Sequence, residues 1–136
     1  MKLRMLSLWC LACGGANLIA LPSHAHHSFA AQYDANKRVT LTGPVTKVEW
    51  MNPHIYFYIN VTDEDSDAVT EYAFEMGSPN TLIRLGWSRN SLKPGDVVSV
   101  EGSLARNGSP LVNAASVVLT ESGRRMFAGS SEESTP

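Results

Sequence analysis

Cysteine is nearly absent from this chain: it has two, Cys10 and Cys13, and both lie close to the N-terminus. Residues 26–136 contain no thiol, which excludes disulfides, thiolate metal sites and cysteine nucleophiles from that part of the protein. A basic excess is also missing, because 11 Lys and Arg residues stand against 13 Asp and Glu residues. A surface without excess positive charge cannot neutralise many phosphates, so nucleic acid is not expected as a partner.

The sequence motifs of several enzyme classes are missing too. There is no Gly-x-Ser-x-Gly nucleophile elbow, no Gly-x-Gly-x-x-Gly fingerprint and no phosphate-binding loop. Asp63, Asp65 and Asp67 have the spacing that opens a calcium loop, but Ala68 and Phe74 stand where that loop needs glycine and glutamate. We therefore interpret residues 63–67 as a solvated turn and predict a binding protein without enzymatic activity.

One long apolar stretch is present, and it stands at the N-terminus. Lys2 and Arg4 precede an apolar run from Met5 to Leu21, and Ser23-His24-Ala25 has small residues where a signal peptidase needs them. This pattern predicts a secretory signal peptide that is cut between Ala25 and His26; a retained membrane anchor is the alternative. The expected protein is periplasmic or secreted and has no membrane attachment after cleavage.

The predicted organisation is a signal peptide at residues 1–25, one domain at residues 26–120 and a flexible tail at residues 121–136. The tail is rich in serine, glycine and glutamate, a composition typical of disordered ends.

Alternating apolar residues dominate the predicted domain. They predict strands over residues 39–50, 55–61, 69–76, 97–104 and 111–119. In the first strand the alternation slips by one residue near Thr46 and Lys47, which predicts a β-bulge.

Between the third and fourth strands the pattern changes. Ser78-Pro79 and Gly86 are the residue types that begin and end a helix. Three strands, a helix and two strands is the element order of an OB-like barrel. The predicted fold is therefore mainly β: a five-stranded OB-like barrel with one short helix between strands 3 and 4. A small β-sandwich is the alternative, and it does not require that helix.

Histidines form the first candidate site. After cleavage, the amine and ring of His26 would chelate a metal ion, and the imidazole of His54 would complete an all-nitrogen site. Such ligands suit Cu(II), so copper is the candidate cofactor, and no other cofactor is expected. His27 offers a competing mode through the amine, a backbone nitrogen and its own ring. The alternative is a solvated pair of histidines and a His54 that caps a strand without metal.

Aromatic residues form the second candidate site. Its members are Trp50, Tyr56, Tyr58, Tyr72 and Trp87. The first three strands of an OB-like barrel form its ligand platform, where Tyr and Trp stack on a sugar or clamp a peptide. The alternative function is therefore a metal-free interaction module that binds a protein, a peptide or a saccharide. Core packing is the competing interpretation of Trp50 and Trp87.

Two carboxylates are closely flanked by apolar strand residues. Glu49 and Glu75 are therefore the residues to inspect for acid–base chemistry. The simpler interpretation places both on the polar face of a half-buried strand, and no catalytic residue is predicted.

Several longer motifs carry a family resemblance. They are His26-His27-Ser28-Phe29-Ala30, the stretch from Val39 to Trp50, Asn52-Pro53-His54, the stretch from Phe74 to Asn80, Gly86-Trp87, residues 92–96 and residues 100–102. Over about residues 26–126 the chain resembles a family of small secreted bacterial proteins of uncharacterised function. The resemblance implies export to the periplasm of a Gram-negative type of bacterium and a single all-β domain. It implies no established activity and no agreed binding residues.

Overall fold

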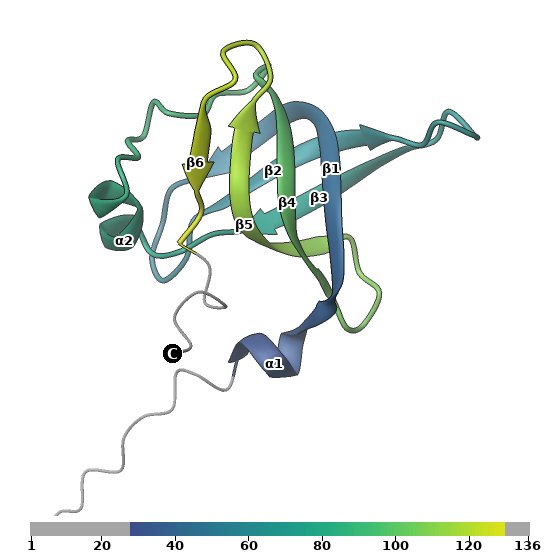
Figure 1. The fold of residues 1–136 in the computed structure, drawn as a ribbon, viewed down its shortest axis with the longest axis horizontal. Coiled ribbons are helices and arrows are strands. Elements are labelled where there is room, and N and C mark those ends of the chain that lie inside the picture. The colour runs from purple at the N-terminus through teal and green to yellow at the C-terminus, as the bar shows by residue number, and fades with distance from the viewer. Residues whose placement is uncertain (1–27, 130–136) are drawn as a thin grey trace, which may run out of the picture.

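The computed structural model describes residues 28–129, in which β-strands predominate (Figure 1). The elements in chain order are α1 (Ser28–Gln32), β1 (Tyr33–Glu49), β2 (Tyr56–Thr62), β3 (Val69–Glu75), α2 (Pro79–Arg84), β4 (Val97–Ala105), β5 (Leu111–Leu119) and β6 (Arg125–Phe127). The mainly β class is therefore confirmed. Within this part of the chain, no helix is long and apolar enough to cross a lipid bilayer. The predicted signal peptide, His26 and His27 lie outside the described residues.

Five of the strands pair in a ring. Antiparallel β1 lies between β2 and β4, β3 pairs with β2, and β5 pairs with β4. A short parallel pairing of β3 with β5 closes the ring, and β6 pairs with β5 beyond it. Strand β1 reaches both of its neighbours because it bends, and its register with β2 shifts between Val45 and Lys47. This is the bulge that the sequence pattern predicted.

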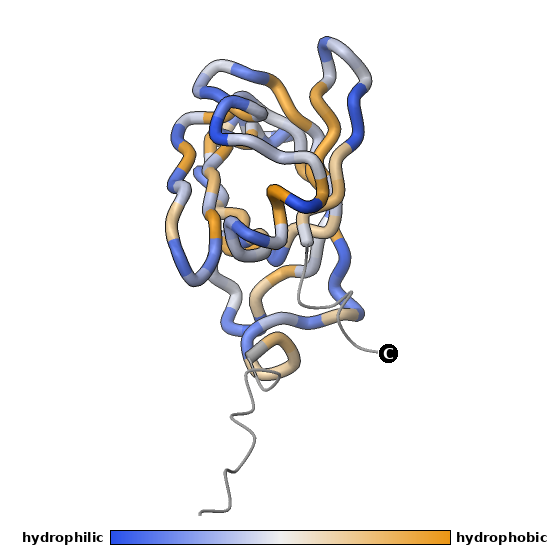
Figure 2. The backbone as a smooth tube through the Cα atoms, turned by 90° about the vertical axis from the view of Figure 1, so that its left-hand side faces the viewer, coloured by the Kyte–Doolittle hydropathy of each residue, from blue (hydrophilic) through white to orange (hydrophobic). Residues whose placement is uncertain are grey.

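The inner face of the ring holds the core. Hydrophobic and hydrophilic stretches alternate along the strands (Figure 2), as expected when one face of each strand is buried. Phe57 and Phe74 stack across β2 and β3 with their ring centroids 5.0 Å apart. Strands β4 and β5 contribute Val98, Val100 and Val117, which are completely buried.

Helix α2 lies between β3 and β4, where the sequence placed a helix. The Ser78 side chain accepts a hydrogen bond from the Thr81 amide at 3.3 Å, and Pro79 occupies the first turn. Leu82 faces the core, whereas Ile83 and Leu85 are exposed.

Two elements were not predicted: α1 and β6. Residues 125–127, assigned to a flexible tail, form β6 because their packing orders them. Met126 is 5% exposed, the Trp87 indole N–H donates to the Phe127 carbonyl at 2.8 Å, and the Gly77 amide donates to the Ala128 carbonyl at 2.8 Å. The tail prediction is therefore wrong for this segment, while residues 130–136 lie outside the described residues.

Candidate functional site

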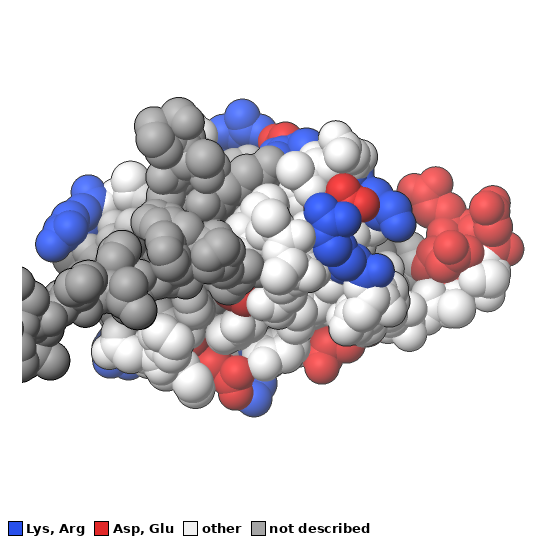
Figure 3. Space-filling view, turned by 90° about the horizontal axis from the view of Figure 1, so that it is seen from below, with Lys and Arg blue, Asp and Glu red and all other residues white. Residues whose placement is uncertain are grey.

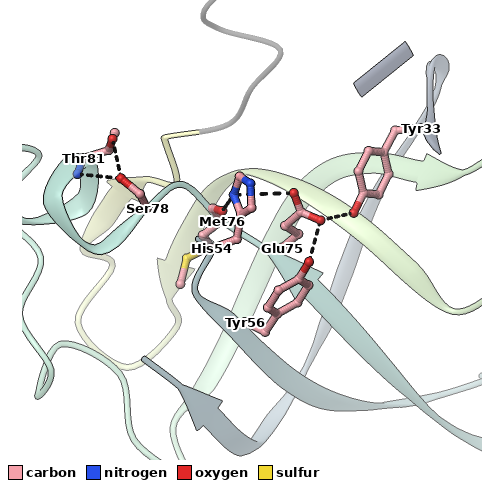
Figure 4. Close-up of polar contacts among 7 residues, drawn as sticks. All are labelled: Tyr33, His54, Tyr56, Glu75, Met76, Ser78 and Thr81. Atoms are coloured by element: carbon pink, nitrogen blue, oxygen red, sulfur yellow. Dashed lines mark hydrogen bonds and ion pairs between the residues drawn. The ribbon is translucent and has the colours of Figure 1, made fainter. Parts of the chain in front are cut away.

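His54 lies in the loop between β1 and β2, directly after a cis Asn52–Pro53 peptide. Its Nδ1 atom is 3.0 Å from the Met76 carbonyl oxygen and 3.6 Å from Glu75 Oε1 (Figure 4). A carbonyl oxygen only accepts hydrogen bonds, so Nδ1 carries the hydrogen and donates it. In the neutral ring, Nε2 then keeps its lone pair. The His54 side chain is 37% exposed, so solvent and ligands can reach its ring.

Glu75, at the end of β3, is the buried carboxylate beside this ring. Its Oε2 atom accepts hydrogen bonds from the hydroxyls of Tyr33 at 2.6 Å and Tyr56 at 2.8 Å (Figure 4). No lysine or arginine within residues 28–129 pairs with it. The two phenol hydrogen bonds and the imidazole therefore offset the cost of burying this carboxylate.

The two phenols act as neutral donors. Burial raises the pKa of Tyr33 well above its usual range, and the hydrogen bond to Glu75 raises it further. Burial also raises the pKa of Tyr56, and the hydrogen bond from Tyr56 to Glu75 raises it further. Both hydroxyls thus keep their hydrogens for Glu75 at neutral and moderately alkaline pH.

Tyr33 also ties the N-terminal segment to this cluster. It is 1% exposed at the start of β1, and the Phe29 ring in α1 lies with its centroid 5.6 Å from the Tyr33 ring. Helix α1 begins directly after His27. The sequence pattern did not point to Tyr33; an aromatic residue at the start of the mainly polar stretch 33–38 was the available signal.

A complete metal site is not present in the described part. Among residues 28–129, no group of three His, Cys, Asp or Glu side chains is placed to hold a metal ion. His54 is the one predicted metal ligand that lies inside this part, so a full coordination sphere needs donors from beyond it.

The five candidate aromatic residues do not share one face. Trp87 is 3% exposed and belongs to the core. Tyr72 pairs in register with the buried Ile59, so it lies on the inner side of the ring. Tyr56 and Tyr58 lie on the outer side, because side chains alternate along a strand.

The two outer tyrosines are already engaged through their hydroxyls. Tyr56 donates to Glu75, and Tyr58 donates to Glu49 at 2.8 Å. Trp50 is half-buried, with the Arg89 guanidinium 5.8 Å from its ring centroid. A single aromatic platform, as the sequence suggested, is therefore not formed.

The two candidate carboxylates differ in their surroundings. Glu49 forms an ion pair with Lys47 and accepts the Tyr58 hydroxyl, and these neighbours hold its pKa below the usual range. Its place on the outer side of β1 matches the polar-face interpretation. Glu75 does not match it, because it is buried and accepts the hydroxyls of Tyr33 and Tyr56.

The acidic turn at residues 63–67 is the tip of the β2–β3 hairpin, and acidic side chains gather at that end of the molecule (Figure 3). The Asp63 carboxylate accepts hydrogen bonds from the Ser66 hydroxyl at 2.7 Å and from the amides of Asp65 and Ser66. These contacts hold the pKa of Asp63 below its usual range. Its carboxylate thus stabilises the turn locally, as expected of a solvated tip.

A known protein family matches much of the chain. The model of a family of unknown function, DUF6152, matches residues 15–112. That range includes Tyr33, His54, Tyr56 and Glu75. Comparison with the curated proteins finds no match. The chain belongs to DUF6152, a family of unknown function, as the resemblance of its motifs led us to expect.

Proposed function

We propose that this is an exported, periplasmic protein that binds one copper ion between its mature N-terminus at His26 and the imidazole of His54. The observation that carries the proposal is the His54 ring itself. Its Nδ1 is taken by the Met76 carbonyl, which leaves Nε2 as the donor atom for a ligand. Metal-bound histidines usually donate their second ring nitrogen to a carbonyl or a carboxylate in this way.

Glu75 supports the same proposal. A buried carboxylate without a lysine or arginine partner in the described part raises the affinity of its surroundings for a cation. It lies 3.6 Å from Nδ1, so its charge favours a positive ion on the opposite ring nitrogen. In this arrangement Glu75 is a positioning residue, and the ligands are nitrogens.

Contacts among the described residues connect α1 with His54. Tyr33 and His54 both contact Glu75, and Phe29 packs on Tyr33. Three residue steps separate His26 from Phe29, a reach of at most roughly 11 Å. The packing of α1 against Tyr33 therefore supports His26 as the partner of His54 in the proposed site.

The proposed fold is an OB-like barrel. Two observations support it: the order in which the five strands pair around the ring, and the place of α2 between β3 and β4. A β-sandwich would not need the parallel pairing of β3 with β5 that closes the ring.

The test is a Cu(II) titration of mature protein that begins at His26. The matched variants are one with an extra N-terminal alanine, His54→Ala and His27→Ala. We expect one-to-one binding that the extra alanine and His54→Ala each weaken by about tenfold or more, and that His27→Ala leaves in place. Glu75→Gln should weaken binding by about tenfold, while Glu49→Gln, at the other carboxylate, should not.

Two results would contradict this assignment. If the extra alanine strengthens binding, His27 has become the third residue of a peptide-type chelate, and the folded domain is not involved. If all variants bind copper as weakly as the isolated peptide of residues 26–32, the metal site is absent. The interaction module then becomes the better hypothesis. Sequencing the N-terminus of protein recovered from the periplasm tests export and the cleavage point independently.

A further inference from the structure

A cavity of about 310 Å³ opens at one end of the strand ring. It lies between the start of β3, the first part of β1 and the turn that joins β4 to β5. Tyr72 and Leu104 form its apolar wall, Lys37 stands beside it, and Ser109 and Pro110 come from the turn. Its size is near the lower end of the range for small-molecule pockets.

The cavity is the open end of the core. Tyr72 pairs with Ile59, which is completely buried on the inner face. Leu104 pairs with Val112, which in turn pairs with the core residue Phe74. Paired residues in a sheet point to the same side, so Tyr72 and Leu104 both face inward. Mouths of β-barrels are a frequent place for ligand sites.

Polar groups at this mouth have bonding capacity that the described residues do not use. Within residues 28–129, the Tyr72 hydroxyl has no hydrogen-bond partner and the Lys37 ammonium has no ion pair. The Ser109 hydroxyl donates to Asn107 Oδ1 at 2.7 Å, which leaves its own lone pairs available. Among residues 28–129, Lys37 is the one charged residue that lines the cavity, and no carboxylate of this part lines it.

The wall formed by the turn is fixed before any ligand arrives. Asn107 Oδ1 also accepts the Ser109 amide at 3.0 Å, and Gly108 adopts the positive φ of 79° that this turn needs. The Pro110 carbonyl accepts the Ala73 amide at 2.9 Å, which fastens the turn to β3. A preformed pocket loses little entropy on binding.

We propose that this mouth binds a small organic carboxylate. Its apolar body packs against Tyr72, Leu104 and Pro110, and its carboxylate pairs with the Lys37 ammonium and accepts the Tyr72 hydroxyl. An inorganic anion would leave the apolar wall uncovered, and a neutral apolar molecule would leave Lys37 unpaired.

The site is independent of the proposed copper site. Tyr72 faces the inside of the ring. Tyr56 and Glu75 pair with each other and face outward, because successive side chains of a strand point to opposite faces of the sheet. Loss of one activity therefore does not imply loss of the other.

The probe is benzoate, and its neutral isostere benzamide is the charge control. Both are titrated into the metal-free protein while backbone amide shifts are recorded by NMR. We expect benzoate to shift the amides of residues 70–73 and 104–111 with one saturable affinity. Lys37→Gln should weaken benzoate about fivefold and leave benzamide unchanged, because an exposed ion pair contributes little more than that. Tyr72→Phe should also weaken benzoate.

Lys93→Gln is the matched control, since Lys93 is exposed in another loop. The proposal is overturned if benzoate does not shift these amides. It is equally overturned if Lys93→Gln weakens benzoate as much as Lys37→Gln does, or if benzoate and benzamide bind alike in every variant.

Discussion

Tyr33 determines how the Glu75 carboxylate is buried. Its side chain is itself buried, and its hydroxyl makes the shorter of the two phenol contacts to that carboxylate. The sequence pattern points to Glu75 and His54 but not to Tyr33, because Tyr33 precedes the alternating pattern of β1. Tyr33 contributes to the cluster because the fold brings the start of β1 next to the end of β3.

The raised pKa of Tyr33 makes stability fall at high pH. Above pH of about 10, the unfolded chain releases the Tyr33 proton while the folded chain retains it. The free energy of unfolding therefore decreases as pH rises through the ordinary tyrosine range, by up to about 1.4 kcal/mol per pH unit for this one group. Urea unfolding between pH 8 and 11, followed by tryptophan fluorescence, measures the slope.

Tyr33→Phe should flatten that slope and lower stability at pH 7, since it leaves Glu75 with one phenol donor fewer. Tyr72→Phe is the control, because its hydroxyl has no partner in the described part. An equal alkaline slope in Tyr33→Phe and the parent protein would contradict the assignment.

At the scale of elements, the sequence pattern predicted the strands that show alternating apolar residues and the helix that has typical end residues. The strand predicted over 111–119 matches β5, and the bulge of β1 lies where the alternation slips. Helix α1 and strand β6 were missed because they are five and three residues long. Elements so short have no periodicity of their own, and tertiary packing decides them.

The close approach of β1 to β2 at Gly43 leaves no room for a side chain. A Cβ atom at Gly43 would overlap the backbone carbonyl of Asn60, which cannot move aside without breaking the sheet. We expect Gly43→Ala to lower the free energy of unfolding by more than about 3 kcal/mol, as overpacking against backbone does. Chemical denaturation measures the loss.

Gly95→Ala separates crowding from backbone strain. Gly95 has a φ of 96° but nothing within 4 Å of the added Cβ, so its loss should be only about 1–2 kcal/mol. Equal losses at the two positions would show that β1 and β2 have room to separate.

At the scale of the whole molecule, the ring needs β6 although β6 is not one of its five strands. Met126 and Ala128 belong to the buried core beside β5, and the Phe127 carbonyl accepts a hydrogen bond from the Trp87 indole. A chain that ends at Glu121 should lose about 3 kcal/mol or more of stability, because it exposes this part of the core.

A chain that ends at Gly129 keeps every one of these contacts and should therefore be clearly more stable than the chain that ends at Glu121. Thermal unfolding of the two truncated proteins compares them directly. If both unfold at the same temperature, β6 contributes nothing and the sequence-based expectation of a tail was adequate.

The parallel pairing of β3 with β5 also governs how the chain reaches its native state. Ala73 pairs with Leu111, although helix α2 and strand β4 separate these two residues along the chain. Closing that long loop costs entropy before any contact repays it, so folding belongs to the slow regime of proteins with high contact order. Until β5 is available, β3 and β4 present unpaired edges, and nascent chains at that stage are prone to associate with one another.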